Sequence, residues 1–184
     1  DPITVDDVLS SRLIADPLHL LDCSLVSDGG AAIVLASAEK AKDFEHAPVY
    51  LIGAGEGHSH EHISQAKSLT TSAAKESGDL AYEMAGLSAS DIHFAQLYDC
   101  FTPTVIIELE DLGFCVKGEG GAFVEGNRLG PGGELPVNTH GGLLSHSHSG
   151  NPGSLFAVTE TVQQLRGELG DRQVPGAEIG LVHG

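Results

Sequence analysis

Residues 92–113 read IHFAQLYDCFTPTVIIELEDLG, and this stretch decides the fold class. The apolar segment Ile92–Leu97 is typical of a short strand, and the segment Thr102–Leu112 that follows it has the spacing of a helix. A proline in the first turn and a glycine after the last turn are usual start and stop signals of a helix. A strand that leads into a helix indicates an α/β fold, in which chemistry collects at the carboxyl ends of strands.

The same alternation of strands and helices continues on both sides of this stretch. Further strands are predicted at Ala31–Ala36, buried on both faces, at Val49–Gly55, where the strand ends in glycines, and at Ile179–Val182. Helices are predicted at Val5–Leu13, Ala38–Phe44, Thr70–Ala85 and Ser154–Leu169. The seven glycines of Gly118–Gly133 predict an exposed hairpin or loop, and Glu45–Pro48 is the best candidate linker.

Composition excludes several classes of function. The 26 acidic residues against nine basic ones give a formal net charge of −17, which would repel nucleic acids and anionic membranes. No apolar run approaches the roughly 20 residues of a membrane span, and the first residues lack the features of a signal peptide. The three cysteines match no zinc or disulfide framework. We therefore expect a cytoplasmic protein with no nucleic-acid or membrane partner.

Three segments follow predicted strands and are candidates for a site: Tyr98–Phe101, Gly141–Gly153 and the final His183-Gly184. In the first of them, Cys100 stands near the start of a helix, where the helix dipole favours a thiolate. Cys100 is thus a candidate nucleophile or acid/base, and Tyr98 a candidate proton donor. The alternative is that Cys100 is a small buried residue that fills space and Tyr98 only a wall residue.

The loop Asn138–Gly153 is the densest polar segment, with three histidines and four glycines. Imidazole can donate to an oxyanion or accept a proton near neutral pH, and glycines let the backbone approach a ligand closely. The alternative is a surface loop that happens to be rich in histidine. The apolar pair Leu143-Leu144 favours a packed loop.

His58, His60 and His62 would share one face of a strand, as zinc ligands sometimes do. No second ligand pair has suitable spacing, so we expect a solvated loop and no metal. The preceding Gly53–Gly57 segment resembles a dinucleotide-binding turn only weakly, because the third glycine is misplaced and no helix follows at once.

These motifs together resemble the C-terminal half of thiolases. Tyr98–Phe101 is similar to the His-Asp-Cys-Phe motif of the sterol-carrier-protein and lipid-transfer-protein type, which includes a branch of steroid side-chain aldolases. Asn138–Gly153 is similar to the stretch with the family's Gly-His-Pro motif, with His148 in the histidine position. Ile14–Ala32 is similar to the end of the thiolase N-terminal half, so the resemblance covers nearly the whole chain.

The resemblance implies a layered α/β fold of the thiolase type, a mixed sheet with helices on both faces. Residues 1–46 would be the end of the N-terminal half, and 47–184 the C-terminal domain, incomplete at its end. Because the chain opens in a helix and stops on a strand, we expect it to be part of a larger protein. Its partners would be the missing N-terminal half, a second copy in a homodimer and, as in some members, a small accessory protein.

The chemistry implied by the resemblance takes place on acyl-CoA thioesters. Coenzyme A would be part of the substrate, with no permanently bound cofactor. His148 would donate to the oxyanion, and Cys100 would be the second acid/base. The sequence departs from the family at Tyr98, which replaces histidine or asparagine, and at the C-terminal cysteine, near whose position His183 stands. Ser147 and Ser149 replace the glycine and proline around His148.

Three functions follow as hypotheses. The first is an enzyme of the thiolase and acyltransferase type that makes or breaks a carbon–carbon bond beside the thioester, in lipid or steroid side-chain metabolism. The second is a retro-aldolase on a β-hydroxyacyl-CoA of a steroid side chain, with Tyr98 as acid/base. The third is a non-catalytic subunit that binds acyl-CoA or lipid.

Overall fold

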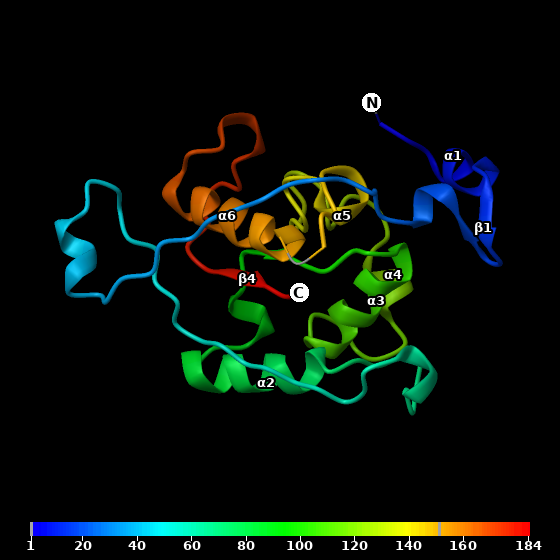
Figure 1. Cartoon of the computed structure of the whole chain (residues 1–184), viewed down its shortest axis with the longest axis horizontal. Coiled ribbons are helices and arrows are strands. Elements are labelled where there is room, and N and C mark those ends of the chain that lie inside the picture. Colours follow the sequence, from blue (N-terminus) through cyan, green and yellow to red (C-terminus); the bar gives the residue numbers. More distant parts are fainter. Residues whose placement is uncertain (1, 151) are drawn as a thin grey trace.

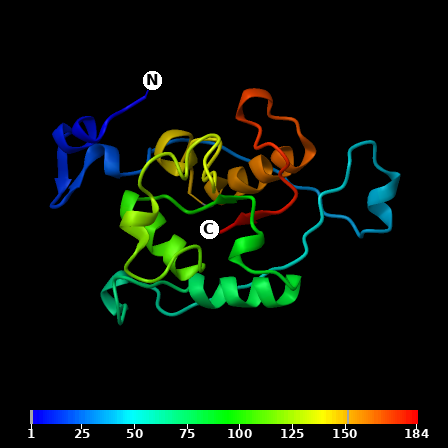
Figure 2. The same ribbon diagram turned by 180° about the vertical axis from the view of Figure 1, so that it is seen from behind.

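Helices lie on both sides of a small central sheet in the computed structural model, which describes residues 2–150 and 152–184 (Figure 1). Helix α6 (Pro152–Arg166) covers one side, and α2 (Ala74–Ala85) and α3 (Thr102–Asp111) cover the other, as the view from behind also shows (Figure 2). This arrangement confirms the predicted α/β class. Asp1, and Asn151 in the predicted histidine-rich loop, lie outside the described residues.

Strand β3 (Phe94–Gln96) is the centre of the sheet, and all three of its residues are fully buried. Strand β4 (Gly180–Val182) runs parallel to it. On the other edge, Ala95 forms a parallel bridge with Val137, so the chain leading into the histidine-rich loop also lies beside β3. A second sheet is the antiparallel pair β1 (Leu13–Ala15) and β2 (Leu18–His19).

Helix α3 carries the core between the sheet and α2. Leu109 and Leu112 pack in one apolar cluster with Ala95 and Leu97 of the central strand region. On its other sides, α3 contacts α2 and the short helix α4 (Gly120–Phe123). Gly78 permits the close contact with α2, since a Cβ there would stand 2.7 Å from a Leu112 methyl carbon.

The strands predicted at Ala31–Ala36 and Val49–Gly55 are absent from the described structure. Both segments are extended, but no other described strand lies beside them to complete a ladder. Their apolar side chains face outward: Val34 is 85% exposed, Leu35 84% and Leu51 80%. The segment that contains Gly53, Gly55 and Gly57 instead runs along α2, where a Cβ would collide with helix carbonyl oxygens. These glycines therefore serve close packing and form no nucleotide-binding turn.

The other elements are short. Helix α1 (Val5–Ser10) begins at Thr4, whose side chain forms a capping box with Asp7, and α5 (Gly142–Ser145) lies in the histidine-rich loop. The helix predicted at Ala38–Phe44 is only a 3₁₀ turn, and the glycine-rich segment 118–133 contains α4. The 3₁₀ turns are η1 (Leu20–Asp22), η2 (Lys40–Asp43), η3 (Ile63–Gln65), η4 (Ala89–Asp91) and η5 (Gly170–Arg172). None of the helices in the described part of the chain has the length and hydropathy needed to cross a lipid bilayer.

Candidate functional site

The three segments that follow strands come together at one end of the central sheet. The backbone N–H of His183 donates to the Gln96 carbonyl at 2.9 Å, which brings the end of β4 beside the end of β3. Tyr98, Gly142 and His183, one from each segment, line one small pocket together with Ser154 at the start of α6. The sequence predicted this convergence from strand ends alone.

Tyr98 and His148 are in direct contact at this place. The Tyr98 hydroxyl lies 3.1 Å from His148 Nε2, and the two rings meet edge to face at a centroid distance of 5.7 Å. The other ring nitrogen, Nδ1, lies 2.6 Å from Ser24 Oγ. The backbone N–H of His148 donates to Ser27 Oγ at 2.8 Å, and this hydroxyl lies 2.9 Å from Ser147 Oγ. The imidazole is therefore held at both nitrogens and at its backbone.

The phenol of Tyr98 is a proton donor in this arrangement. Burial raises its pKa, and the neighbouring Cys100, Glu108 and Asp99 raise it further. A protonated phenol donates to Nε2, which assigns the imidazole proton to Nδ1 and directs it to Ser24. The result is a chain of three groups, phenol, imidazole and hydroxyl, through which a proton can move.

Cys100 lies in the same turn but has a different neighbour. Its Sγ is 3.6 Å from Thr104 Oγ1 in the first turn of α3. Burial raises the pKa of the thiol, and the Thr104 hydrogen bond offsets this only in part. The expectation that the helix N-terminus favours a thiolate is thus not met in this structure.

Two polar residues that sequence reasoning missed fix this geometry. Asp99 is buried, and its carboxylate accepts the Leu143 N–H at 2.6 Å at the start of α5. Asn138 has a positive φ of 51°, and its side chain accepts from Leu97 N at 2.7 Å and donates to Leu97 O at 3.1 Å. Asn138 thus extends the ladder by one residue toward Tyr98. Asparagine tolerates a positive φ better than most residues do. This preference is the only feature of the sequence that points to the role of Asn138.

Glu108 of α3 lies beneath the turn, with its side chain 4% exposed. Its Oε2 accepts the Tyr98 N–H at 3.0 Å and stands 3.1 Å from His183 Nδ1. Burial raises the pKa of Glu108. Burial also works to lower the pKa of His183, but the Glu108 carboxylate outweighs it, so the pKa of His183 is raised. Sequence reasoning located His183 at a strand end and missed Glu108.

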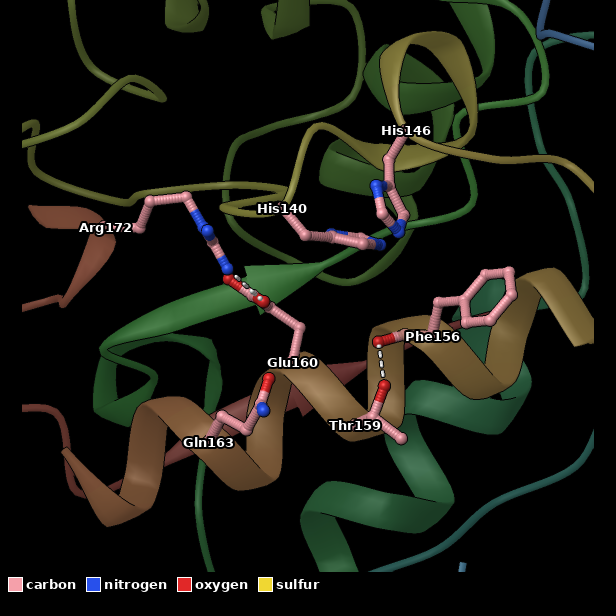
Figure 3. A pocket seen from close by; sticks show the side chains of 7 residues that line it. All are labelled: His140, His146, Phe156, Thr159, Glu160, Gln163 and Arg172. Atoms are coloured by element: carbon pink, nitrogen blue, oxygen red, sulfur yellow. Dashed lines mark hydrogen bonds and ion pairs between the residues drawn. The ribbon is translucent and has the colours of Figure 1, made fainter. Parts of the chain in front are cut away.

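His140 and His146 belong mainly to a second pocket of about 190 Å³ (Figure 3). In this close-up the two imidazoles point toward each other, with ring centroids 5.3 Å apart, and the His146 ring meets Phe156 of α6 edge to face at 5.8 Å. Glu160 is buried and is paired with Arg172 at 3.2 Å and with the Thr139 hydroxyl at 2.7 Å. Burial lowers the pKa of His140. Of the three loop histidines, only His148 contacts Tyr98 in the described structure.

His58, His60 and His62 lie exposed in a loop, where His58 pairs with Glu56 at 2.8 Å. Within residues 2–150 and 152–184, no three histidine, cysteine or acidic side chains gather closely enough to hold a metal ion.

Comparison with known proteins gives a consistent picture. A family model described as thiolase C-terminal domain-like matches residues 55–184. An acetyl-CoA acetyltransferase of Methanothermobacter thermautotrophicus is 40% identical over 98% of the chain. A steroid side-chain-cleaving aldolase of Thermomonospora curvata is 42% identical over 90% of the chain, and sterol carrier protein 2 of Oryctolagus cuniculus is 39% identical over 98%.

Among solved structures, one named Ltp2-ChsH2(DUF35) aldolase superimposes with a TM-score of 0.87 at 39% identity, over 96% of this chain and 46% of the other. The matched part is 48% of the acetyltransferase, 43% of the aldolase and 34% of the sterol carrier protein. The chain thus spans half or less of the length of these relatives. The predicted resemblance to thiolases of the sterol-carrier and aldolase type is confirmed.

Proposed function

Because the chain belongs to the thiolase C-terminal domain-like family, we propose that it supplies part of the active site of an enzyme that cleaves a carbon–carbon bond beside an acyl-CoA thioester. The reaction we propose is retro-aldol cleavage of a β-hydroxyacyl-CoA, with a steroid side chain as the leading acyl group. The observation that carries the proposal is the contact between the Tyr98 hydroxyl and His148 Nε2 at 3.1 Å. Coenzyme A is part of the substrate, and no permanently bound cofactor takes part.

The chemistry begins at the β-hydroxyl of the substrate. The Tyr98 oxygen accepts the proton of this hydroxyl while its own proton passes to His148 Nε2. The bond between Cα and Cβ then breaks, Cβ becomes a carbonyl carbon, and the electron pair spreads over the thioester as an enolate. The imidazolium of His148 now donates toward the enolate oxygen, where negative charge develops. Ser24 holds the ring through Nδ1 during both steps.

The state of Cys100 supports this reaction over acyl transfer. A retro-aldol cleavage needs no acyl-enzyme and no thiolate, and the raised pKa of the Cys100 thiol fits a residue that is not the principal base. Tyr98 occupies the position that contacts His148. The steroid side-chain-cleaving aldolase of Thermomonospora curvata, which is 42% identical to this chain, also supports the retro-aldol reaction.

The rest of the enzyme is also part of the proposal. Residues 1–46 are the end of an N-terminal half and 47–184 a C-terminal domain, and the first unit contributes Ser24 and Ser27 to the site. The other half of the relatives' length supplies the remaining site surface. A second copy in a homodimer and a small accessory protein complete the assembly, in line with the two components that the name of the aldolase structure joins. Three free cysteines fit a reducing cytoplasm.

Two substitutions in the complete enzyme, with any partner protein present, test the proposed reaction. Tyr98→Phe keeps the ring and removes the proton, so kcat for cleavage of a β-hydroxyacyl-CoA without free CoA should fall by about 10²–10⁴. Cys100→Ala should lower the same kcat by less than about tenfold. Thermal melting of both variants checks that the fold is intact. Strict dependence on free CoA with a β-keto substrate would refute the retro-aldol reaction.

Thiolytic acyl transfer is the second candidate, and the 40% identity to an acetyl-CoA acetyltransferase over nearly the whole chain favours it. In that case the order of the two variants reverses: Cys100→Ala abolishes proton transfer at the α-carbon and Tyr98→Phe is mild. If both variants keep full activity, the chain is a binding subunit with its chemistry elsewhere.

A further inference from the structure

Of the three segments that converge at the end of the sheet, the one that begins with His183 has no role in the proposed reaction. His183 follows β4 directly, its backbone N–H is fixed to Gln96 O at 2.9 Å, and it lines the small pocket with Tyr98. Its side chain is 23% exposed. Its Nδ1 is buried and has no well-aligned hydrogen-bond partner, although the Glu108 carboxylate is at contact distance.

The buried carboxylate of Glu108 orients the imidazole of His183. A carboxylate that is 4% exposed on the core side of α3 is costly unless charged or polar groups compensate it. Two groups do so at the same oxygen, the Tyr98 N–H at 3.0 Å and His183 Nδ1 at 3.1 Å. A carboxylate beside Nδ1 favours a proton on that nitrogen, which leaves the chemistry to Nε2. One buried carboxylate thus orients both the turn that carries Tyr98 and the imidazole that shares its pocket.

The proposed cleavage leaves one step without a group to perform it. After the bond between Cα and Cβ breaks, the enolate carbon must receive a proton before acyl-CoA can leave. His148 is committed to the enolate oxygen and to Tyr98. The Cys100 thiol contacts Thr104 Oγ1 at 3.6 Å and is not among the residues that line the pocket shared by Tyr98 and His183, so the proton for carbon must come from another group.

We infer that His183 is a second acid/base, which delivers its Nε2 proton to the α-carbon, and that Glu108 is its positioning residue. The inference rests on the proposed function. In this step the electron pair of the enolate forms the new C–H bond, the thioester carbonyl is restored, and His183 becomes neutral. His148 then releases the proton that it received from Tyr98, and His183 takes one up from solvent. Over the whole cycle, the substrate loses the proton of its β-hydroxyl and gains one proton at its α-carbon, so no oxidant or reductant is needed.

The charges around His183 suit this role. Glu108 faces it from α3, Asp111 adds negative charge from the same helix, and Tyr98, Asp99 and His140 share its pocket. The raised pKa keeps the imidazole protonated to higher pH than an exposed histidine, as a proton donor to carbon requires.

Exchange of α-protons tests the inference without the cleavage reaction. The complete enzyme, with any partner protein, is incubated with propionyl-CoA in D₂O, and deuterium at the α-carbon is followed by mass spectrometry. In this direction neutral His183 removes the proton. We expect His183→Gln to lower the exchange rate by about 10²-fold or more, the scale of a lost general base. Tyr98→Phe should change exchange by only a few fold, because no β-hydroxyl is present. His46→Gln, at an exposed histidine, is the matched control.

A second variant separates positioning from loss of the fold. Glu108→Gln keeps the shape of the side chain and removes its charge, so the pKa of His183 should fall. Exchange, which needs the neutral imidazole, should then begin at lower pH than in the wild type, and its maximal rate should fall several fold. A structural defect alone would lower the rate without moving the pH profile.

The outcomes distinguish the inference from the proposed function. If the enzyme cannot cleave a β-hydroxyacyl-CoA but exchanges α-protons in a His183-dependent manner, the retro-aldol reaction is wrong and the role of His183 stands. Exchange that persists in His183→Gln overturns the inference whatever the cleavage assay shows. An enzyme that cleaves but shows no exchange in the wild type overturns it as well.

Discussion

One imidazole holds the candidate site together. His148 contacts the Tyr98 hydroxyl through Nε2 and Ser24 through Nδ1, so it connects a turn after β3 with a segment more than 70 residues earlier in the chain. Neighbouring His140 and His146 line the second pocket (Figure 3), and in the described part of the chain no hydrogen bond joins either ring to Tyr98 or Ser24. Position in the fold, and not residue type, therefore separates the three histidines.

Replacement of His148 should reveal this difference. We expect His148→Ala to reduce kcat of the complete enzyme by about 10²–10³, the size of the loss of one oxyanion donor. His146→Ala is the matched control, and both it and His140→Ala should cost less, measured in the same assay. Near-normal turnover of His148→Ala would make the loop purely structural.

At this scale the sequence predicted which residues carry chemistry better than what holds them. Tyr98, Cys100 and His148 stand out by type and by their place after strands. The roles of Asp99, Asn138 and Glu108 depend on contacts with other segments, such as the Asn138 side chain bonded to Leu97 from 41 positions away. Local patterns contain no information about such pairs.

The elements show the same division between local and distant causes. α2, α3, α6, β3 and β4 were predictable, because apolar spacing, start and stop signals and burial agree for each of them. Ala31–Ala36 has the composition of a buried strand, yet a strand needs a partner for its ladder and the described chain provides none. The thiolate expected for Cys100 failed for a related reason, since burial of the thiol depends on the packing around it.

Asp111 at the end of α3 is the clearest element-scale link. Its side chain is 1% exposed and accepts from Ser72 N at 2.6 Å, Thr71 Oγ1 at 3.0 Å and Lys117 Nζ at 2.7 Å, so it ties α3 to the segment before α2. Burial works to raise its pKa, but these partners outweigh it and hold the pKa below its usual value.

We expect Asp111→Asn to lower the free energy of unfolding by about 1.5–3 kcal/mol near neutral pH, the usual worth of hydrogen bonds to a charged group. A depressed pKa contributes stability above the unfolded value of about 3.9 and loses it as pH falls through the folded value. The difference between wild type and variant in urea denaturation should therefore shrink below about pH 4. Asp79→Asn, in an exposed pair with Lys75, is the control and should change stability by less than about 1 kcal/mol. A difference that stays constant with pH would contradict the assignment.

On the scale of the whole molecule, two extended segments leave apolar side chains without cover. Residues 31–36 belong to the stretch that runs along α6, where Gly29 approaches Phe156, and residues 49–57 run along α2 (Figure 1). Each segment thus covers a helix with one side and exposes Val34, Leu35, Tyr50 and Leu51 on the other. Large exposed apolar side chains in neighbouring positions mark an interaction site in many proteins. Relatives are roughly twice as long as the matched region, so we expect the covering layer to come from the part of their length that this chain does not span.

Hydrogen exchange measures this directly. In the chain alone, the amides of residues 31–36 and 49–53 have no strand partner among the described residues and should exchange close to the rate of an unstructured peptide. In the complete enzyme they should be protected by about 10²-fold or more, because a paired strand opens only with its surroundings. The exposed loop 58–62 is the internal control and should exchange fast in both forms. If protection requires only a second copy of this chain, it will rise with protein concentration in the chain alone, and the cover is a homodimer contact. Equal, fast exchange in both forms would mean that the two segments are not strands of a larger sheet, and the apolar surface would then need another explanation.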